Sequence, residues 1–134
     1  MRVSSCGMNV PDELRYTKDH EWVRLTGNDA TVGITEYAAS QLGDIVFVEL
    51  PEVGRTLTQS AAFGVVESVK AVSDLFAPVS GPVVEANAAL TGEPELVNSE
   101  PYGAGWMVRV TVTDPTELDG LLDPTAYDAL IAEG

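Results

Sequence analysis

A lysine with carboxylates on both sides is the part of the sequence best suited to chemistry. Lys70 lies between two runs of small branched residues in GVVESVKAVSDLFAPVSGPVVE, residues 64–85, and the only other lysine in the chain is Lys18. Glu67 precedes it by three residues and Asp74 follows it by four. At this spacing the carboxylates flank the amine without forming a buried acid pair with strongly shifted pKa values. Lys70 is therefore either an ordinary solvated lysine or a point of covalent attachment.

An attachment lysine needs an exposed amine on a rigid base, and the residues around Lys70 predict such a base. The valines on both sides favour extended backbone, because branched side chains restrict the first side-chain torsion. We expect strands over 63–69 and 72–79, joined by Lys70 and Ala71 at the tip of a hairpin. The scarcity of lysine adds weight to the attachment hypothesis but does not prove it.

Other reactive groups are sparse. Cys6 is the only cysteine, so the chain has no internal disulfide, and a reducing compartment is the simplest setting. No paired cysteines or histidines have the spacing of metal ligands, so we expect no metal site. The single histidine, His20, leaves little capacity for acid-base catalysis, and we expect it to be non-catalytic and Trp22 to lie in the core. Gly103-Ala104-Gly105 precedes a strand and does not match a phosphate-binding loop.

Composition predicts one folded domain. The chain has 134 residues, 45% of them hydrophobic and 21% charged, which suits a single hydrophobic core and argues against disorder. The net charge of -14 makes nucleic acid an unfavourable partner, because nucleic-acid affinity depends on cationic side chains. The acidity either serves solubility or directs the protein toward basic surfaces of partner proteins.

The N-terminal stretch MRVSSCGMNVPDEL lacks the apolar segment of a signal peptide and the repeated arginines of a transit peptide. No run of apolar residues is long enough to span a membrane, so we expect no membrane association. The expected location is the cytoplasm of a bacterial-type cell, or the mitochondrial matrix if this is the mature form of a eukaryotic protein.

The first half of the chain reads as strands around one helix. Residues 21–35 predict a hairpin, and a short helix follows between a cap at Thr35 and a stop at Gly43. DIVFVELP, residues 44–51, predicts a strand with alternating faces. One face would carry Val46 and Val48, and the other Ile45, Phe47 and Glu49.

The second half predicts further strands and a helical C-terminus. We expect a turn at 80–82 leading into a strand, and an irregular loop over 87–105, where Gly and Pro are frequent. A strand over 106–112 and short helices over 116–122 and 123–134 complete the chain, the last helix capped by Asp123. Short strands with turns at close intervals are typical of small sandwiches and barrels.

The attachment segment FGVVESVKAVSDLFAPVSG resembles that of lipoyl carriers, and specifically that of the H proteins of the glycine cleavage system. Gly54 and Gly81 also match that family, as do three further motifs. These motifs are YTKDHEWV at 16–23, GITEYAASQLGDIVFVELPEVG at 33–54 and NSEPYGAGW at 98–106. Biotin carriers usually have methionines beside their lysine, and lipoyl domains of 2-oxo acid dehydrogenases have Asp-Lys-Ala, whereas here Val69 and Ala71 flank Lys70.

The resemblance covers the chain from about Leu14 to the C-terminus and implies its fold and cofactor. It implies a mostly β barrel-sandwich hybrid, or hammerhead, of the biotinyl and lipoyl carrier type, with short peripheral helices that include C-terminal ones. Residues 14–134 would form a single lipoyl-carrier domain after a flexible N-terminal segment, residues 1–13. Lipoate would be attached covalently to Lys70.

The resemblance also assigns roles to the carboxylates. In this family the loaded arm folds back onto the protein, and the matching positions are Glu21 and Asp74, which would accept hydrogen bonds from the amine. Glu67 is a further candidate for arm docking or ligase recognition. Asp19 stands where many relatives have serine.

The implied function is that of a non-catalytic carrier in glycine catabolism and one-carbon metabolism. The lipoyl-lysine swinging arm would take the aminomethyl group of glycine from the glycine decarboxylase, a pyridoxal-phosphate enzyme. It would then visit the tetrahydrofolate-dependent aminomethyltransferase and the dihydrolipoyl dehydrogenase. A lipoate ligase, or a lipoyl or octanoyl transferase, would load Lys70.

Two alternatives use the same residues differently. The protein could be a lipoyl relay that donates lipoate to 2-oxo acid dehydrogenase subunits, and deletion of the gene would distinguish this role by its effect on their lipoylation. It could also be a β-rich interaction module with an unmodified Lys70, and Lys70→Ala would then leave activity intact.

Overall fold

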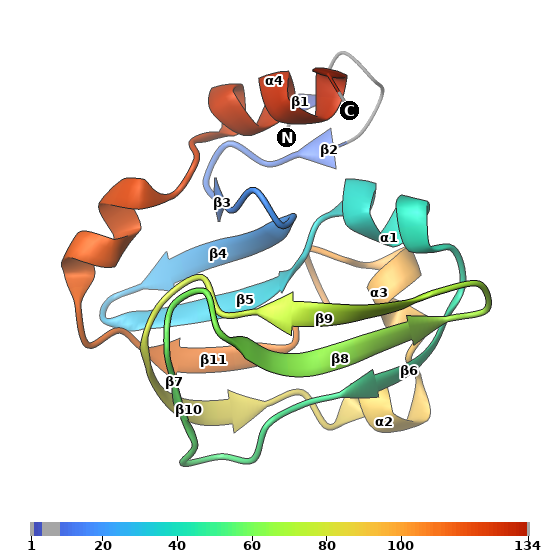
Figure 1. The fold of residues 1–134 in the computed structure, drawn as a ribbon, viewed down its shortest axis with the longest axis horizontal. Coiled ribbons are helices and arrows are strands. Elements are labelled where there is room, and N and C mark those ends of the chain that lie inside the picture. The colour runs from blue at the N-terminus through green and yellow to red at the C-terminus, as the bar shows by residue number, and fades with distance from the viewer. Residues whose placement is uncertain (1, 4–8, 134) are drawn as a thin grey trace.

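The structure is a computed structural model, and it describes residues 2–3 and 9–133. Cys6 lies outside the described residues. The fold is mostly β, with short helices at its periphery and at the C-terminal end, as predicted (Figure 1). Two antiparallel sheets hold most of the strands, and a two-stranded ribbon of β1 (Arg2–Val3) and β2 (Asn9–Val10) lies near the C-terminal helix.

The larger sheet has six strands in the order β3-β4-β5-β11-β10-β7. Its strands are β3 (Arg15–Tyr16), β4 (Glu21–Thr26), β5 (Asp29–Ile34), β7 (Thr56–Leu57), β10 (Gly81–Ala86) and β11 (Val108–Thr111). The β4–β5 hairpin is the one predicted for residues 21–35, with Thr26 paired to Asp29 across the turn. The predicted turn at 80–82 is shorter than expected, because Gly81 and Pro82 already pair with β7.

The smaller sheet has three strands in the order β6-β8-β9. They are β6 (Ile45–Glu49), β8 (Ala62–Ser68) and β9 (Val72–Phe76). The predicted alternation along β6 is wrong, because the pairing with β8 shifts register between Ile45 and Phe47. Such an irregularity puts an extra residue into one strand. As a result Ile45 and Val48 are buried, while Val46 and Phe47 are 52% and 49% exposed.

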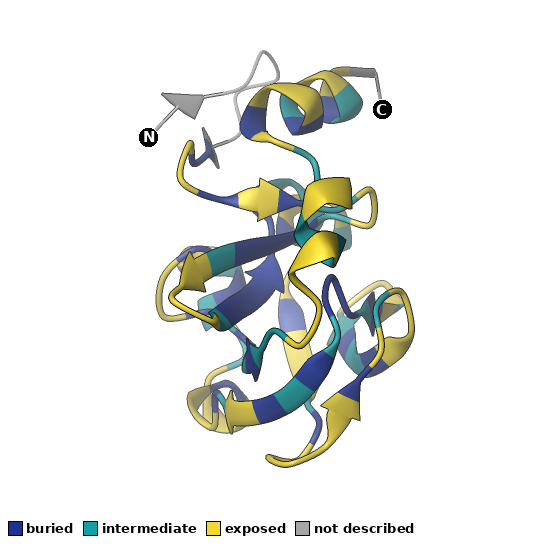
Figure 2. Ribbon diagram, turned by 90° about the vertical axis from the view of Figure 1, so that its left-hand side faces the viewer, coloured by how far each residue is buried: buried dark blue, intermediate teal, exposed yellow. Residues whose placement is uncertain are grey.

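The main core lies between these two sheets. Val32 and Val110 from the larger sheet belong to the same buried cluster as Val48, Val66 and Leu75 from the smaller one. Figure 2 shows buried residues along the middle of the strands and exposed residues at the turns that join them. Burial of apolar area between the sheets stabilises this arrangement.

A second buried cluster joins the C-terminal helix to the larger sheet. Trp22 belongs to it, is fully buried, and donates a hydrogen bond of 2.9 Å from Nε1 to the carbonyl of Pro101, which confirms its prediction as a core residue. The rings of Tyr16 and Tyr127 stack in this cluster at a centroid distance of 4.6 Å. Val10 is also fully buried here, so the packed chain begins before residue 14. The flexibility of residues 1–13 stays a prediction.

The helices form mainly where local signals predict them. Thr35 caps α1 (Glu36–Leu42) by accepting from the Ala38 N–H, and Gly43 ends it. The first predicted C-terminal helix is the 3₁₀ helix η1 (Pro115–Gly120), and Asp123 accepts from the Ala126 N–H at the start of α4 (Pro124–Glu133). The prediction of an irregular loop over 87–105 is partly wrong, because it contains α2 (Ala89–Gly92) and α3 (Leu96–Ser99).

Candidate functional site

Lys70 lies at the exposed tip of the β8–β9 hairpin, where the sequence placed it. The connection between the strands is Val69, Lys70 and Ala71, and Ser68 closes it. The Ser68 N–H donates to the Ala71 carbonyl at 2.8 Å, and its hydroxyl oxygen accepts from the Ala71 N–H at 3.0 Å and the Lys70 N–H at 3.3 Å. The lysine therefore stands on a tightly bonded turn.

The segment that ends α1 and begins β6 lies beside this tip. The Val69 N–H donates to the carbonyl of Asp44 at 3.0 Å. A side chain at Gly43 would place its Cβ 3.4 Å from Cε of Lys70, so the aliphatic part of the lysine lies against the backbone of this glycine. Lys70 makes no ion pair with any described residue. The amine of Lys70 is thus exposed, while the backbone before it is held by the bond to Asp44 and its aliphatic stem lies against Gly43.

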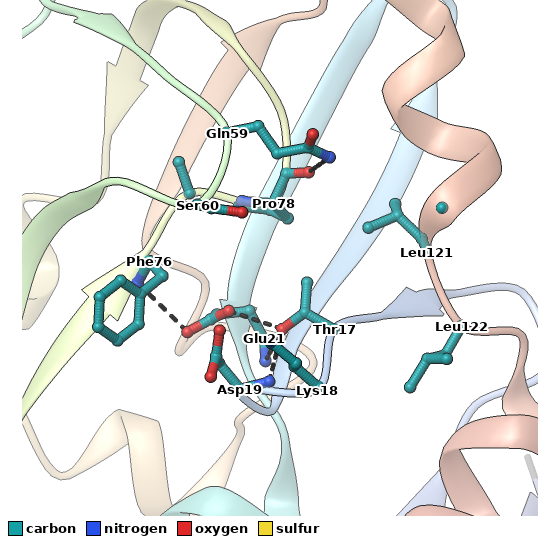
Figure 3. Close-up of a pocket in the computed structure, with 12 residues that line it drawn as sticks. Thr17, Lys18, Asp19, Glu21, Gln59, Ser60, Phe76, Pro78, Leu121 and Leu122 are labelled. Atoms are coloured by element: carbon teal, nitrogen blue, oxygen red, sulfur yellow. Dashed lines mark hydrogen bonds between the residues drawn. The ribbon is translucent and has the colours of Figure 1, made fainter.

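A cleft of about 250 Å³ lies between the larger sheet, the end of β9 and the C-terminal segment (Figure 3). The residues that line it are Thr17, Lys18, Asp19, Glu21, Gln59, Ser60, Phe76, Ala77, Pro78, Gly120, Leu121 and Leu122. Glu21 is its most buried carboxylate, at 2% exposed. The side chains of Leu121 and Leu122 come from the connection between η1 and α4 and form the opposite wall.

Two hydrogen bonds orient the carboxylate of Glu21. The hydroxyl of Thr17 donates to Oε1 at 2.7 Å, and the backbone N–H of Phe76 donates to Oε2 at 3.3 Å. Burial raises the pKa of Glu21 to about 7, although both hydrogen bonds favour the ionised form. This carboxyl therefore exchanges its proton near neutral pH and can either accept or donate a hydrogen bond there.

The outer face of β9 connects the lysine tip to this cleft. Side chains alternate along a strand, so Val72, Asp74 and Phe76 share one face, while Leu75 points into the core. Val72 and Asp74 are exposed, and the N–H of Phe76 contacts Glu21. The outer face of β9 therefore runs from the tip at Lys70 toward the cleft that contains Glu21.

The structure does not bring the four predicted site residues into one cluster. Asp74 lines a different cleft, of about 260 Å³, together with Glu49, Arg55 and Val65 among others. Glu67 is half-buried in the central strand β8, paired with Phe47 on one side and Val72 on the other. Only Glu21 lies in the cleft beside the C-terminal segment.

His20 is packed against aromatic rings. Its Nδ1 lies 2.9 Å from the hydroxyl of Tyr127, and its ring is tilted against Tyr37 at a centroid distance of 5.0 Å. Burial lowers the pKa of His20, although the carboxylate of Asp19 opposes this effect. These contacts fix the position of His20, the residue directly before Glu21, and its side chain does not line the cleft.

Sequence reasoning missed Thr17, the backbone N–H of Phe76 and the wall formed by Leu121 and Leu122. Thr17 is an ordinary polar residue four positions before Glu21, and the two leucines lie about a hundred positions after it. Only the folded chain brings them together, through the paired backbone bonds between Tyr16 and Leu122 of 2.9 and 2.7 Å.

Two packed antiparallel sheets with a lysine at an exposed hairpin tip define the barrel-sandwich class of carrier domains. The family model described as Glycine cleavage H-protein matches residues 14–134. The chain belongs to this family.

Relatives and a solved structure agree with this assignment. Glycine cleavage system H protein from Symbiobacterium thermophilum is 60% identical over 126 residues, which cover 94% of this chain and 98% of that protein. The protein of the same name from Phenylobacterium zucineum is 64% identical over 119 residues, covering 89% and 98%. The crystal structure of a glycine cleavage system H protein from Mycobacterium marinum matches with a TM-score of 0.85 at 42% identity, covering 92% of this chain and 99% of that chain.

The likeness to the Mycobacterium marinum structure confirms the predicted barrel-sandwich fold. Among the described residues, no helix is long and apolar enough to cross a membrane.

Proposed function

We propose that this chain is the lipoyl-bearing, non-catalytic carrier of a glycine cleavage system, with lipoate in amide linkage to Lys70. The observation that carries the proposal is the exposed Lys70 on a bonded hairpin tip, within the sequence motif of a family matched over residues 14–134. The lipoyl group, when bound, supplies a disulfide that is reduced as one of its sulfurs takes up the aminomethyl group. The remaining chemistry belongs to partner enzymes.

The residues around Lys70 fit such a group. The amine is exposed, so a loading enzyme can reach it, and the stem of the lysine rests on Gly43 without a side chain in between. Acylation removes the positive charge, and because Lys70 makes no ion pair with the described residues, no partner charge is left uncompensated. The apolar side chain of Val72 begins a path along which an aliphatic arm can lie.

We assign the docking of a cationic amine to the cleft at Glu21. An ionised Glu21 accepts a hydrogen bond from the amine, and a charge-assisted bond of this kind is worth roughly 1.5 to 3 kcal/mol. Phe76, Leu121 and Leu122 line the cleft beside Glu21 and offer apolar contacts to an aliphatic arm. Asp74, on the outer face of β9, offers a second carboxylate along the path. Glu67 remains a candidate for recognition by the loading enzyme.

The proposed partners are glycine decarboxylase, the aminomethyltransferase, the dihydrolipoyl dehydrogenase and a lipoate ligase or lipoyl or octanoyl transferase. An excess of 21 acidic over 7 basic side chains favours partners with basic surfaces. We propose a bacterial setting for this system, because the relatives that the chain resembles come from bacteria, and within it a cytoplasmic location.

Reconstitution with glycine decarboxylase tests the proposal. Lipoylated wild-type protein is expected to support exchange of labelled bicarbonate into the carboxyl group of glycine, whereas Lys70→Arg protein treated identically is not. Lys18→Arg is the matched substitution at the other lysine, and because Lys18 lines the cleft, its control readout is lipoylation of Lys70, which is expected to equal that of the wild type. Exchange activity in the Lys70→Arg protein equal to that of the wild type would refute the role of Lys70.

A further inference from the structure

Asn98 clamps the segment that lies under the lysine tip. Its Nδ2 donates a hydrogen bond of 2.9 Å to the carbonyl of Gly43, and its Oδ1 accepts one of 2.8 Å from the N–H of Ile45. The two bonds bracket Asp44 from both sides. The side chain comes from α3, in a part of the chain more than fifty residues away in sequence.

The clamped segment is the same one that contacts the tip. The carbonyl of Asp44 accepts from the N–H of Val69, the residue directly before Lys70, at 3.0 Å. Gly43, held by Asn98, provides the surface against which the lysine stem lies. Asn98 is thus connected to Lys70 through two short routes, one by way of Val69 and one by way of Gly43.

The regular sheet does not hold this end of the hairpin by itself. The pairing of β6 with β8 ends at Ile45 and Ser68 and is irregular between Ile45 and Phe47. β6 is an edge strand, so no strand among the described residues bonds with its outward backbone groups. The amide of Asn98 satisfies the Ile45 N–H in place of a strand.

We propose that Asn98 is a positioning residue that holds segment 43–45 so that Lys70 is presented to its loading enzyme in one conformation. This inference rests on the proposed function in one respect, namely that Lys70 is the residue that becomes acylated. Loss of the clamp lets the tip sample other conformations, and an enzyme that binds only the competent conformation then has a lower apparent affinity.

The chemistry of the amide makes the role specific. The amide of Asn98 supplies a donor and an acceptor on separate atoms, whereas an ionised aspartate of the same length has acceptors alone. Asn98→Asp retains the acceptor for Ile45 but places a carboxylate against the carbonyl of Gly43. Asn98→Ala removes both bonds and leaves the neighbouring backbone groups without them.

Asn87 provides a matched control in the same region of the chain. It is 7% exposed, and its Nδ2 donates to the carbonyls of Ala104 and Trp106 at 2.8 and 2.7 Å. Its Oδ1 also accepts from the Ala89 N–H at 3.2 Å. Asn87→Ala therefore removes three side-chain to backbone hydrogen bonds, at least as many as Asn98→Ala, but none that involve segment 43–45 or the tip.

The test measures lipoylation kinetics and amide hydrogen exchange on folded full-length proteins. We expect Asn98→Ala and Asn98→Asp to raise the KM of a lipoate ligase for this protein about tenfold with little change in kcat. We also expect the Val69 amide to exchange about tenfold faster relative to amides in the middle of β8. Asn87→Ala should leave the KM of the ligase and the relative exchange rate of the Val69 amide at their wild-type values.

Two results would overturn the inference. One is an unchanged KM and unchanged Val69 exchange in folded Asn98 variants, and the other is an equal effect in Asn87→Ala, which would indicate general destabilisation. If the wild-type protein itself takes no lipoate at Lys70, the proposed function fails. The rate of hydrogen exchange at the Val69 amide still decides whether Asn98 holds the tip. Failure of the proposed function and failure of the inference about Asn98 are therefore distinguishable.

Discussion

The backbone N–H of Phe76 donates a hydrogen bond of 3.3 Å to Oε2 of Glu21. The bond joins the end of β9, in the smaller sheet, to the start of β4, in the larger one. It lies where the face that leads away from Lys70 meets the cleft. The ionisation of Glu21 is therefore coupled both to the packing of the two sheets and to the electrostatics of the proposed docking cleft.

Replacing Glu21 by glutamine removes this ionisation. The pKa of Glu21 is raised from 4.5 to about 7 in the folded protein, so between these values the folded state keeps a proton that the unfolded chain has lost. The group's contribution to the free energy of unfolding is therefore full below pH 4.5 and is lost as pH rises through about 7. As pH rises from 4.5 to 8, the wild type loses this contribution and Glu21→Gln does not. The free energy of unfolding of Glu21→Gln should therefore rise by about 3 kcal/mol relative to that of the wild type across this range.

Urea denaturation of both proteins across this pH range measures the difference. His20 has a lowered pKa and acts in the opposite sense, since its contribution is lost as pH falls below 6.5, but it is present in both proteins and cancels. A stability difference that stays constant between pH 4.5 and pH 8 would contradict the raised pKa of Glu21.

Substituting Gly81 by alanine should strongly destabilise the protein. Gly81 has a φ of 150°, and a Cβ there would overlap the carbonyl oxygen of Thr111 and lie 3.2 Å from Cγ1 of Val110. We expect a loss of more than about 4 kcal/mol or a failure to fold. Gly27→Ala is the control, because Gly27 has a φ of 63° with open space around it and should lose only about 1 kcal/mol. Equal stability losses in the two variants would show that the overlap at Gly81 is relieved.

The hydroxyl of Tyr127 anchors α4 to the rest of the protein. It lies 2.7 Å from Oγ1 of Thr35, the cap of α1, and 2.9 Å from Nδ1 of His20. Tyr127→Phe keeps the ring stacking and should lower the free energy of unfolding by about 2 kcal/mol, because it removes hydrogen bonds to buried groups. Tyr37→Phe, which alters a ring beside His20 instead, should change it by less than about 0.5 kcal/mol. Thermal or urea denaturation measures the stability of both variants. A Tyr127→Phe protein as stable as the wild type would contradict the anchoring role of this hydroxyl.

Local chemistry was sufficient to predict the parts of the fold that present the lysine. The β-branched runs around Lys70 specify extended strands, and Thr35 and Gly43 are strong start and stop signals for α1. The polar turn at 26–29 fixed the β4–β5 hairpin in the same way. These elements form from interactions between residues close in sequence, so the sequence alone was informative there.

Tertiary contacts decide the parts that were not predicted. The helices α2 and α3 have four residues each and no side-chain cap, so their stability comes from packing, with Leu90 and Val97 buried in the main core. The irregular pairing of β6 depends on its partner strand, and the depth of Glu21 depends on a C-terminal segment distant in sequence. No local pattern encodes these contacts.

Intact-protein mass measurement with peptide mapping, before and after incubation with a lipoate ligase, lipoate and ATP, tests the central claim most directly. Lys18 is an internal control, because it is also exposed. We predict a single lipoyl increment confined to the peptide that contains Lys70, and none in folded Lys70→Ala protein. A folded sample that takes no lipoate under conditions that modify a known acceptor, or that takes it at Lys18, would contradict the assignment of this chain as a lipoyl carrier.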